Sequence, residues 1–384
     1  MFAYGFLSVV LALYLDAIGF SKETIGLLLT LALVGDALVS FWITTSADRI
    51  GRRRMLIAGA VLMALGGVAF ALTTNAIALM VVATIAVFSP SGSEVGPFLS
   101  IEQASLSQLT APARRTMTFA RYVLAGSFAT ATGALGAGVV ASALQRRGVS
   151  AAQSYHVLLW VYAAFGVLLA VLFLRLSPAI EAPPATTRSR FGLHKSRGAV
   201  MRLSALFALD AFAGGFILQS LMALWFHLRF NFDIASLGAL FFAANILAGL
   251  SALWAARIAE RLGLINTMVV THLPSNVMLV LVPLMPNATS AVILLLVRYS
   301  ISQMDVPTRQ SYTMAIVDPD ERSAAAGITG IARSVGAALS PAISGALIAN
   351  AALIAAPFYL AGGLKIVYDL LIYRSFKRLR PPEE

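Results

Sequence analysis

Ionisable residues inside long apolar stretches are the first candidates for chemistry, because a charge in a membrane-spanning helix is costly and usually serves a site. The candidates for substrate binding or proton coupling are Asp36, Glu94, Glu102, Asp210, Asp305, Arg309 and Arg333. A carboxylate removed from water holds its proton more tightly and can therefore carry one. Basic side chains at the same depth suit a polar or anionic solute.

Glu102 and Arg309 occupy matching positions in the two halves of the chain. Each lies ten residues before a proline, Pro112 or Pro319, which places it about 15 Å from the nearest helix end at 1.5 Å per residue. The spacing predicts an acid and a base at equivalent depths in a central site, and Glu102→Gln should remove pH dependence if Glu102 carries the coupled proton. The alternative is a structural charge pair inside each half.

Two stretches have the composition of broken helices. Asp305 precedes Arg309 by four residues, so the two can pair on one helix face, and Pro307 between them opens the helix. Residues 89–97 contain two prolines and two glycines around Glu94. Broken spans at corresponding positions of two halves indicate a binding site. The alternative for Glu94 is a kink near the outer surface.

The remaining buried charges have a structural and a functional interpretation. Asp36 lies twelve residues before Asp48, which places it about 18 Å from that end of its helix. It either carries a proton or pairs with Arg121 or Arg333. Lys365 and Asp369, four residues apart, are expected to neutralise one another.

Other charged and metal-binding residue types give weaker signals. Arg298 is expected to extend to the outer membrane surface. None of the four histidines has a partner at metal-ligand spacing, so neither a metal nor a cofactor is predicted.

The elements that must position these residues follow from the composition. Of 384 residues, 59% are hydrophobic and 12% charged, and the mean hydropathy is +0.84, whereas soluble proteins are about a quarter charged. A polytopic membrane protein is predicted.

The absence of cysteine excludes disulfides and thiolate chemistry. The net charge of +11 comes mostly from short gaps between apolar runs, which is typical of membrane topology and not of nucleic-acid binding. Without a nucleotide-binding or hydrolase motif, no enzyme is predicted.

Twelve apolar runs predict an all-α fold of twelve transmembrane helices. They span residues 2–20, 24–46, 54–73, 76–109, 115–144, 155–176, 201–228, 234–256, 264–286, 288–315, 323–349 and 351–374. We expect an N-terminal six-helix bundle over 1–176, a cytoplasmic linker over 177–198 and a C-terminal six-helix bundle over 199–384. With both termini cytoplasmic, 19 Lys and Arg lie inside and 4 outside, which sets the orientation.

The two halves also match in sequence, which predicts two parallel six-helix repeats. Residues 25–51 match 237–263 at an offset of 212, and Pro112 to Arg115 matches Pro319 to Arg322 at an offset of 207.

The stretch 46–54, Ser-Ala-Asp-Arg-Ile-Gly-Arg-Arg-Arg, resembles the loop signature of the major facilitator superfamily. The leading glycine of that signature is missing, and so is the Gly-Pro antiporter signature of the fifth span. The resemblance implies a gating loop formed by Asp48, Arg49, Gly51, Arg52 and Arg53, next to the start of the eleventh span.

The resemblance implies a secondary transporter working by alternating access. We expect a monomer in the bacterial inner (plasma) membrane that moves a small polar or anionic solute, with a proton or another coupling ion and no nucleic-acid partner. One alternative is proton-driven efflux of amphipathic compounds, and another is a non-transporting sensor on the same scaffold.

Overall fold

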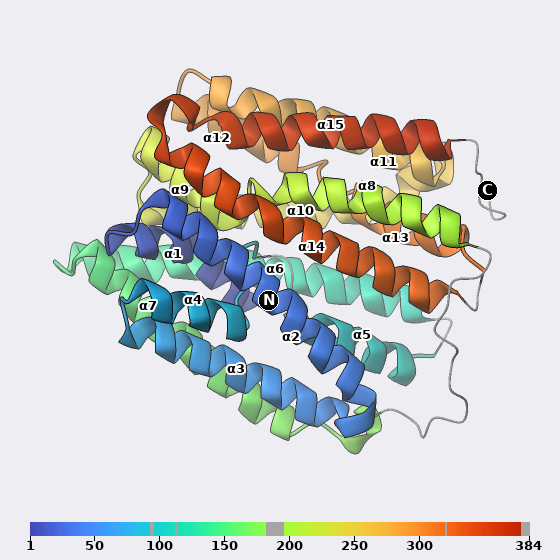
Figure 1. Cartoon of the computed structure of the whole chain (residues 1–384), viewed down its shortest axis with the longest axis horizontal. Coiled ribbons are helices and arrows are strands. Elements are labelled where there is room, and N and C mark those ends of the chain that lie inside the picture. The colour runs from blue at the N-terminus through green and yellow to red at the C-terminus, as the bar shows by residue number, and fades with distance from the viewer. Residues whose placement is uncertain (93–95, 112–113, 182–195, 319–320, 378–384) are drawn as a thin grey trace. The chain divides into compact units, whose positions relative to one another are not determined.

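The computed structural model describes residues 1–92, 96–111, 114–181, 196–318 and 321–377, and these ranges are helical with short connections (Figure 1). The α-helices are α1 Phe2–Ala17, α2 Lys22–Ile50, α3 Arg52–Leu72, α4 Ala76–Ile85, α5 Gly96–Leu109, α6 Arg115–Arg146, α7 Ala151–Leu174, α8 Arg197–Gly215, α9 Gln219–Phe230, α10 Ile234–Leu262, α11 Leu264–Leu281, α12 Ala288–Tyr299, α13 Asp305–Ala315, α14 Arg322–Ala349 and α15 Ala356–Phe376. Short 3₁₀ turns are η2 Pro178–Ile180, η3 Val282–Leu284 and η4 Ala351–Leu353. The all-α prediction is confirmed.

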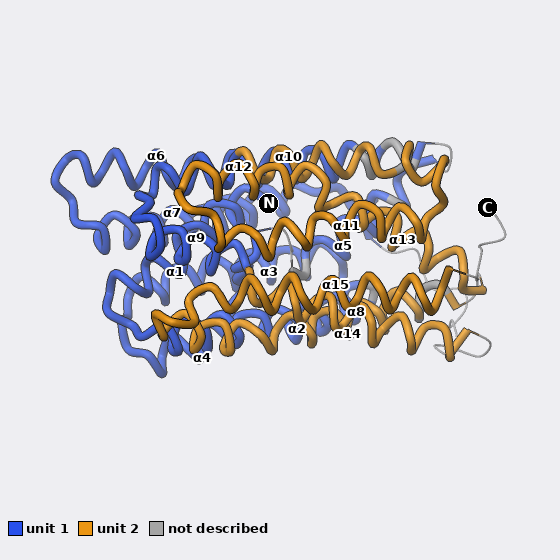
Figure 2. Tube along the Cα trace, turned by 90° about the horizontal axis from the view of Figure 1, so that it is seen from above, with its two compact units in different colours: residues 1–187, 218–242 blue, residues 188–217, 243–384 orange. Residues whose placement is uncertain are grey.

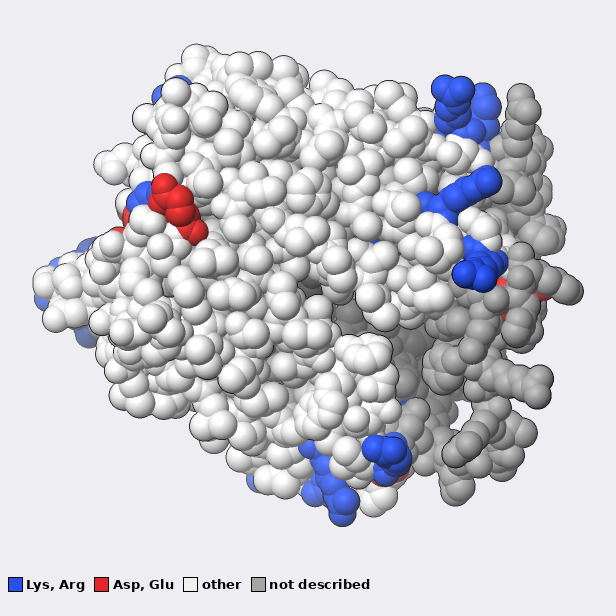
Figure 3. Space-filling view, in the orientation of Figure 1, with Lys and Arg blue, Asp and Glu red and all other residues white. Residues whose placement is uncertain are grey.

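Many of these helices are suited to a bilayer. Within the described ranges, nine helical segments are long and apolar enough to cross a membrane, and α1, α4 and α12 are shorter apolar helices. Large apolar side chains such as Leu38, Phe41 and Leu72 are more than half exposed, which suits contact with lipid. Most of the surface in Figure 3 carries no charge, and Lys and Arg gather near its margins. How many helices cross the membrane stays a prediction.

The helices pack into two compact units (Figure 2). Unit 1 comprises residues 1–187 and 218–242, and unit 2 comprises residues 188–217 and 243–384. In unit 1, α3 packs along α7, and α1 packs along α6 and α9. In unit 2, α8 packs along α14 and α15, and α11 packs along α15 and α13. The predicted domain boundaries at residues 176 and 199 stay a prediction.

Glycine sets the same turn in both repeats. Gly51 ends α2 with φ 118°, and its predicted repeat mate Gly263 separates α10 from α11 with φ 79°. A positive φ is disfavoured for residues with a Cβ, which explains why glycine stands at both positions.

Both predicted helix breaks are present. The fourth apolar run divides into α4 and α5, and Pro90 and Gly92 (φ 75°) lie between them. The tenth divides into α12 and α13 at residues 300–304, and Pro307 falls in the first turn of α13, where no backbone donor is needed. A third break, not predicted, separates α8 from α9 at residues 216–218.

Candidate functional site

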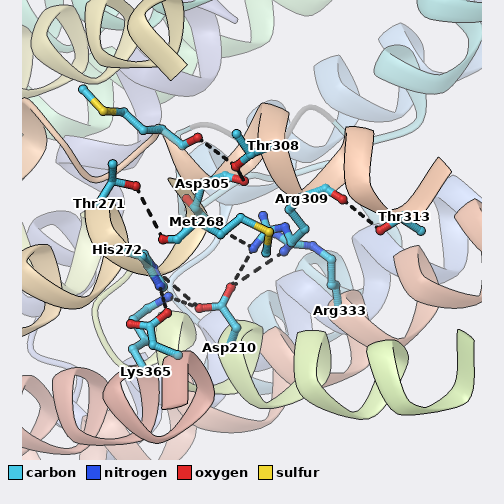
Figure 4. A network of polar contacts seen from close by, with 12 residues as sticks. Asp210, Met268, Thr271, His272, Asp305, Thr308, Arg309, Thr313, Arg333 and Lys365 are labelled. Atoms are coloured by element: carbon cyan, nitrogen blue, oxygen red, sulfur yellow. Dashed lines mark hydrogen bonds and ion pairs between the residues drawn. The ribbon is translucent and has the colours of Figure 1, made fainter. Parts of the chain in front are cut away.

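The carboxylate of Asp210, on α8, is the centre of a buried charged cluster in unit 2 (Figure 4). Its Oδ1 lies 2.5 Å from Lys365 Nζ of α15, and its Oδ2 lies 3.0 Å from Arg309 Nη1 of α13 and 3.8 Å from Arg333 Nη1 of α14. The Asp210 side chain is only 6% exposed. Three helices thus direct cations at one carboxylate. We define the charged cluster as Asp210, His272, Asp305, Arg309, Arg333, Lys365 and Asp369.

Arg309 joins two carboxylates of the cluster. Its Nη1 lies 3.0 Å from Asp305 Oδ2, one turn away on α13, and 3.0 Å from Asp210 Oδ2. The guanidinium lies over the ring of Phe207, 5.5 Å from its centroid, which adds a cation–π contact. The predicted pairing of Asp305 with Arg309 is confirmed.

The predicted neutralisation of Lys365 by Asp369 is wrong. Lys365 donates to Asp210, while Asp369 Oδ1 lies 2.7 Å from His272 Nδ1 and its Oδ2 accepts from Asn276 Nδ2 at 2.9 Å. A spacing of four residues permits a contact on one helix face, but partners on α8 and α11 satisfy these two groups instead.

His272, on α11, belongs to the site, although its sequence spacing excluded only a metal role. Its Nε2 faces Asp210 Oδ1 at 3.9 Å, and its ring meets that of Tyr368 edge-on at 5.9 Å between centroids. A sequence signal was present, because His272 and Asn276 lie four residues apart among polar residues of an otherwise apolar helix. Such a polar helix face predicts a polar site inside a bundle.

The charged cluster has equal numbers of acidic and basic side chains besides His272, and one of these side chains is partly exposed. Three carboxylates stand against two arginines and one lysine, and this pairing compensates the high cost of burying each charge. Arg333 is 31% exposed, whereas every other member is at most 10% exposed. Arg333 is therefore the most accessible member of the cluster.

Arg298 differs from its prediction. It is buried, with its guanidinium over the ring of Tyr299 at 5.2 Å, and does not extend to the surface. The neighbouring tyrosine ring gives the buried cation a favourable contact.

Unit 1 holds the acidic candidates of the N-terminal half. Glu102 on α5 is half-buried and accepts a hydrogen bond from the hydroxyl of Tyr122 on α6. Asp36 is half-buried on α2, whereas Arg121 is exposed. Glu94 lies outside the described residues. A functional relation between Glu102 and Arg309 stays a prediction.

Comparison with known proteins identifies the family. Residues 1–306 match the model of the Major Facilitator Superfamily. The chain belongs to the major facilitator superfamily. Across 98% of its length and 91% of the relative, it is 29% identical to YJR124C, an uncharacterized membrane protein of Saccharomyces cerevisiae.

Solved members of the superfamily share the fold. The nucleoside transporter NupG matches with a TM-score of 0.74 at 14% identity, covering 98% of this chain and 96% of that one. A bacterial homologue of the human lysosomal transporter Spinster matches with a TM-score of 0.76 at 15% identity, over 99% and 95%. The human organic anion transporter MFSD10 matches with a TM-score of 0.62 at 17% identity, over 97% and 95%. At these identities the likeness shows the fold alone.

The superfamily signature lies at the junction of α2 and α3, where only Gly51 separates the two helices. A residue that the sequence did not single out anchors this junction. The carboxylate of Glu181 accepts from the backbone N–H groups of Arg52, at 2.6 Å, and Arg53, at 3.3 Å. These are orphan donors at the N-terminus of α3, where a negative charge also meets the positive end of the helix dipole. The Arg52 side chain donates to Gln108 Oε1 at 2.8 Å, and Gln108 in turn donates to the Glu181 carbonyl at 2.9 Å.

The remaining loop residues give less information. Arg53 donates to the carbonyl of Leu174, and Arg49 is exposed. The side chain of Asp48 lies outside the described part of the chain, so its gating role stays a prediction.

We expect Glu181→Gln to destabilise the protein by about 1 kcal/mol, because the amide loses the charge that caps α3 and one of its two acceptor oxygens. The melting temperature of the detergent-purified protein measures this change. Glu260→Gln, at an exposed position of α10, is the matched control. Equal melting temperatures for the two variants would contradict the capping role.

Proposed function

We propose that the chain is a proton-coupled secondary active transporter for small polar or anionic solutes, working by alternating access, and that the charged cluster is its solute and coupling site. The observation that carries the proposal is the carboxylate of Asp210, buried among Lys365, Arg309 and the partly exposed Arg333. Ionisable residues inside membrane spans mark solute and proton pathways. The cluster spans α8, α11, α13, α14 and α15, so any rearrangement of these helices changes its contacts.

The names of two structural neighbours define the solutes to test. NupG is a nucleoside transporter and MFSD10 an organic anion transporter. We therefore include uridine as a neutral nucleoside and gluconate and inorganic phosphate as anions, with ethidium for the efflux of amphipathic compounds.

Uptake and efflux in proteoliposomes test the proposal. With a proton gradient imposed, we expect saturable transport of at least one polar or anionic solute, and collapse of the gradient should abolish its accumulation. Ethidium transport alone would favour the efflux alternative. Protein that moves none of the solutes under either condition would overturn the proposal.

The proposal includes an orientation in a bacterial inner (plasma) membrane with both termini cytoplasmic. The chain has no cysteine, so Ser150→Cys and Ser189→Cys each introduce a unique thiol. An impermeant thiol reagent added to intact cells should label position 150 and not 189, because the basic linker is expected inside. The reverse labelling pattern would overturn the orientation.

A further inference from the structure

His272 lies between two carboxylates that come from different helices. Its Nδ1 is 2.7 Å from Asp369 Oδ1 on α15, and its Nε2 is 3.9 Å from Asp210 Oδ1 on α8. The amide nitrogen of Asn276 lies 2.9 Å from the other oxygen of Asp369 and 3.2 Å from His272 Nδ1. The imidazole is 6% exposed, so its neighbours are mainly protein groups.

The two ring nitrogens have different roles in this geometry. We assign the proton of the neutral imidazole to Nδ1, because the Asp369 carboxylate accepts there at 2.7 Å. The Asn276 amide then donates to the other oxygen of Asp369, at 2.9 Å, and not to Nδ1. The lone pair of Nε2 then faces Asp210 without a hydrogen between them. A proton added at Nε2 converts this contact into an ion pair, so Asp210 stabilises the charged ring.

Other histidines of the described chain have different surroundings. His156 Nε2 lies 2.7 Å from the carbonyl of Ala71, and His227 Nδ1 lies 2.8 Å from the carbonyl of Phe232. Neither contact involves a carboxylate, so these residues serve as controls.

The groups around His272 come from α12, α13 and α15, which pack against α11, and from α8 and α14. They are Asp210 on α8, Arg298 on α12, Asp305 and Arg309 on α13, Arg333 on α14, and Lys365, Tyr368 and Asp369 on α15. With His272 neutral, the charged cluster has no net charge, and protonation of His272 gives it one positive charge. Arg298 keeps its charge in both states and does not alter this difference.

We propose that His272 Nε2 binds the coupled proton and that the resulting positive charge recruits a monovalent oxyanion, a carboxylate or a phosphate, to Arg333. The inference rests on the proposed function and names its substrate class. The Nε2 lone pair forms the new N–H bond with a proton from water on the loading side, and the same bond breaks on release.

This chemistry couples the two ions. The site has the same net charge when it is empty and when it holds both proton and anion, whereas either ion alone changes that charge by one unit in a low-dielectric environment. Only the two states of equal charge should reorient, which gives symport of one proton with one monovalent anion.

The first experiment needs no solute. The protein is labelled with ¹⁵N-histidine and reconstituted in lipid nanodiscs, and the His272 resonances are assigned by their loss in His272→Asn. We expect Nδ1 to stay protonated while Nε2 changes from unprotonated to protonated as the pH falls from 8 to 5. An unchanged Nε2 resonance over this range would overturn the inference, whatever the transport assays show.

The second experiment measures proton influx into pyranine-loaded proteoliposomes on addition of gluconate, lactate or inorganic phosphate, with sorbitol as the neutral control. Wild-type influx should require an anion and fall by up to about tenfold per pH unit on its alkaline limb, as expected for one bound proton. His272→Asn keeps the hydrogen bond to Asp369 but cannot ionise, so it should abolish the influx.

The control His227→Gln should leave the pH profile unchanged. If His272→Asn keeps the wild-type pH profile, the role of His272 is overturned. If the pH dependence is lost in Glu102→Gln and not in His272→Asn, the coupled proton belongs to Glu102. Sorbitol-driven proton influx would overturn the substrate class. Failure of wild-type protein to move any of the anions in either assay would instead contradict the proposed function.

Discussion

Asp210→Asn should reduce solute transport by at least about 100-fold and also destabilise the protein. The carboxylate compensates Lys365, Arg309 and Arg333, and its removal leaves buried cations unpaired, which costs about 3–5 kcal/mol. Initial uptake rates in proteoliposomes, normalised to the amount of reconstituted protein, measure the first effect. The melting temperature in detergent measures the second.

A matched control and a double variant separate function from folding. Asp233→Asn changes the same residue type at the N-terminus of α10, where Asp233 accepts from the Ser236 backbone N–H at 2.8 Å and asparagine caps equally well. It should therefore leave stability and transport almost unchanged. The double variant Asp210→Asn/Lys365→Met removes one cation as well and should regain stability without regaining transport. Recovery of both would show that Asp210 only neutralises Lys365.

Local features of the chain were predictable from the sequence. The turns at Gly51 and Gly263, the helix break before Pro307 and the pairing of Asp305 with Arg309 all depend on residues a few positions apart. Backbone geometry decides such features, and it follows from residue type and spacing.

Contacts between distant helices were not predictable in the same way. The partners of Lys365 and Asp369 are 155 and 97 residues away, on α8 and α11. Which helices lie beside α15 depends on the packing of the whole unit, and this packing overrides the contact that the spacing of four residues permits. His272 was missed for the same reason, since nothing in the sequence places a carboxylate at each of its two nitrogens.

The contact between Glu181 and the N-terminus of α3 could not be predicted from the sequence either. Glu181 follows α7 by a few residues and falls within the linker predicted over residues 177–198, where nothing in the sequence distinguishes it. Only the folded chain brings its carboxylate to the backbone of Arg52 and Arg53, which are 129 and 128 residues away.

Arg309→Gln should be the second most damaging change, because Arg309 Nη1 holds both Asp210 and Asp305 at 3.0 Å. We expect transport to fall below detection and stability to fall by about 3–5 kcal/mol, as for other buried pairs that lose one partner. Uptake rates and chemical denaturation of the purified protein measure the two losses. Arg309→Lys keeps the charge but not the planar group that bridges two carboxylates, so it should recover stability only in part.

Double-mutant cycles then decide which acid acts with Arg309. Asp305 is in direct contact, so Arg309→Gln/Asp305→Asn should show a coupling free energy of about 0.5–3 kcal/mol in stability. The repeat positions predict that Arg309 also acts with Glu102, whose described partner is Tyr122. Coupling in transport but not in stability for Arg309→Gln/Glu102→Gln would support a shared solute site. Additive effects of Arg309→Gln and Asp305→Asn on stability would contradict the bridge, because groups in direct contact within one buried network do not act independently.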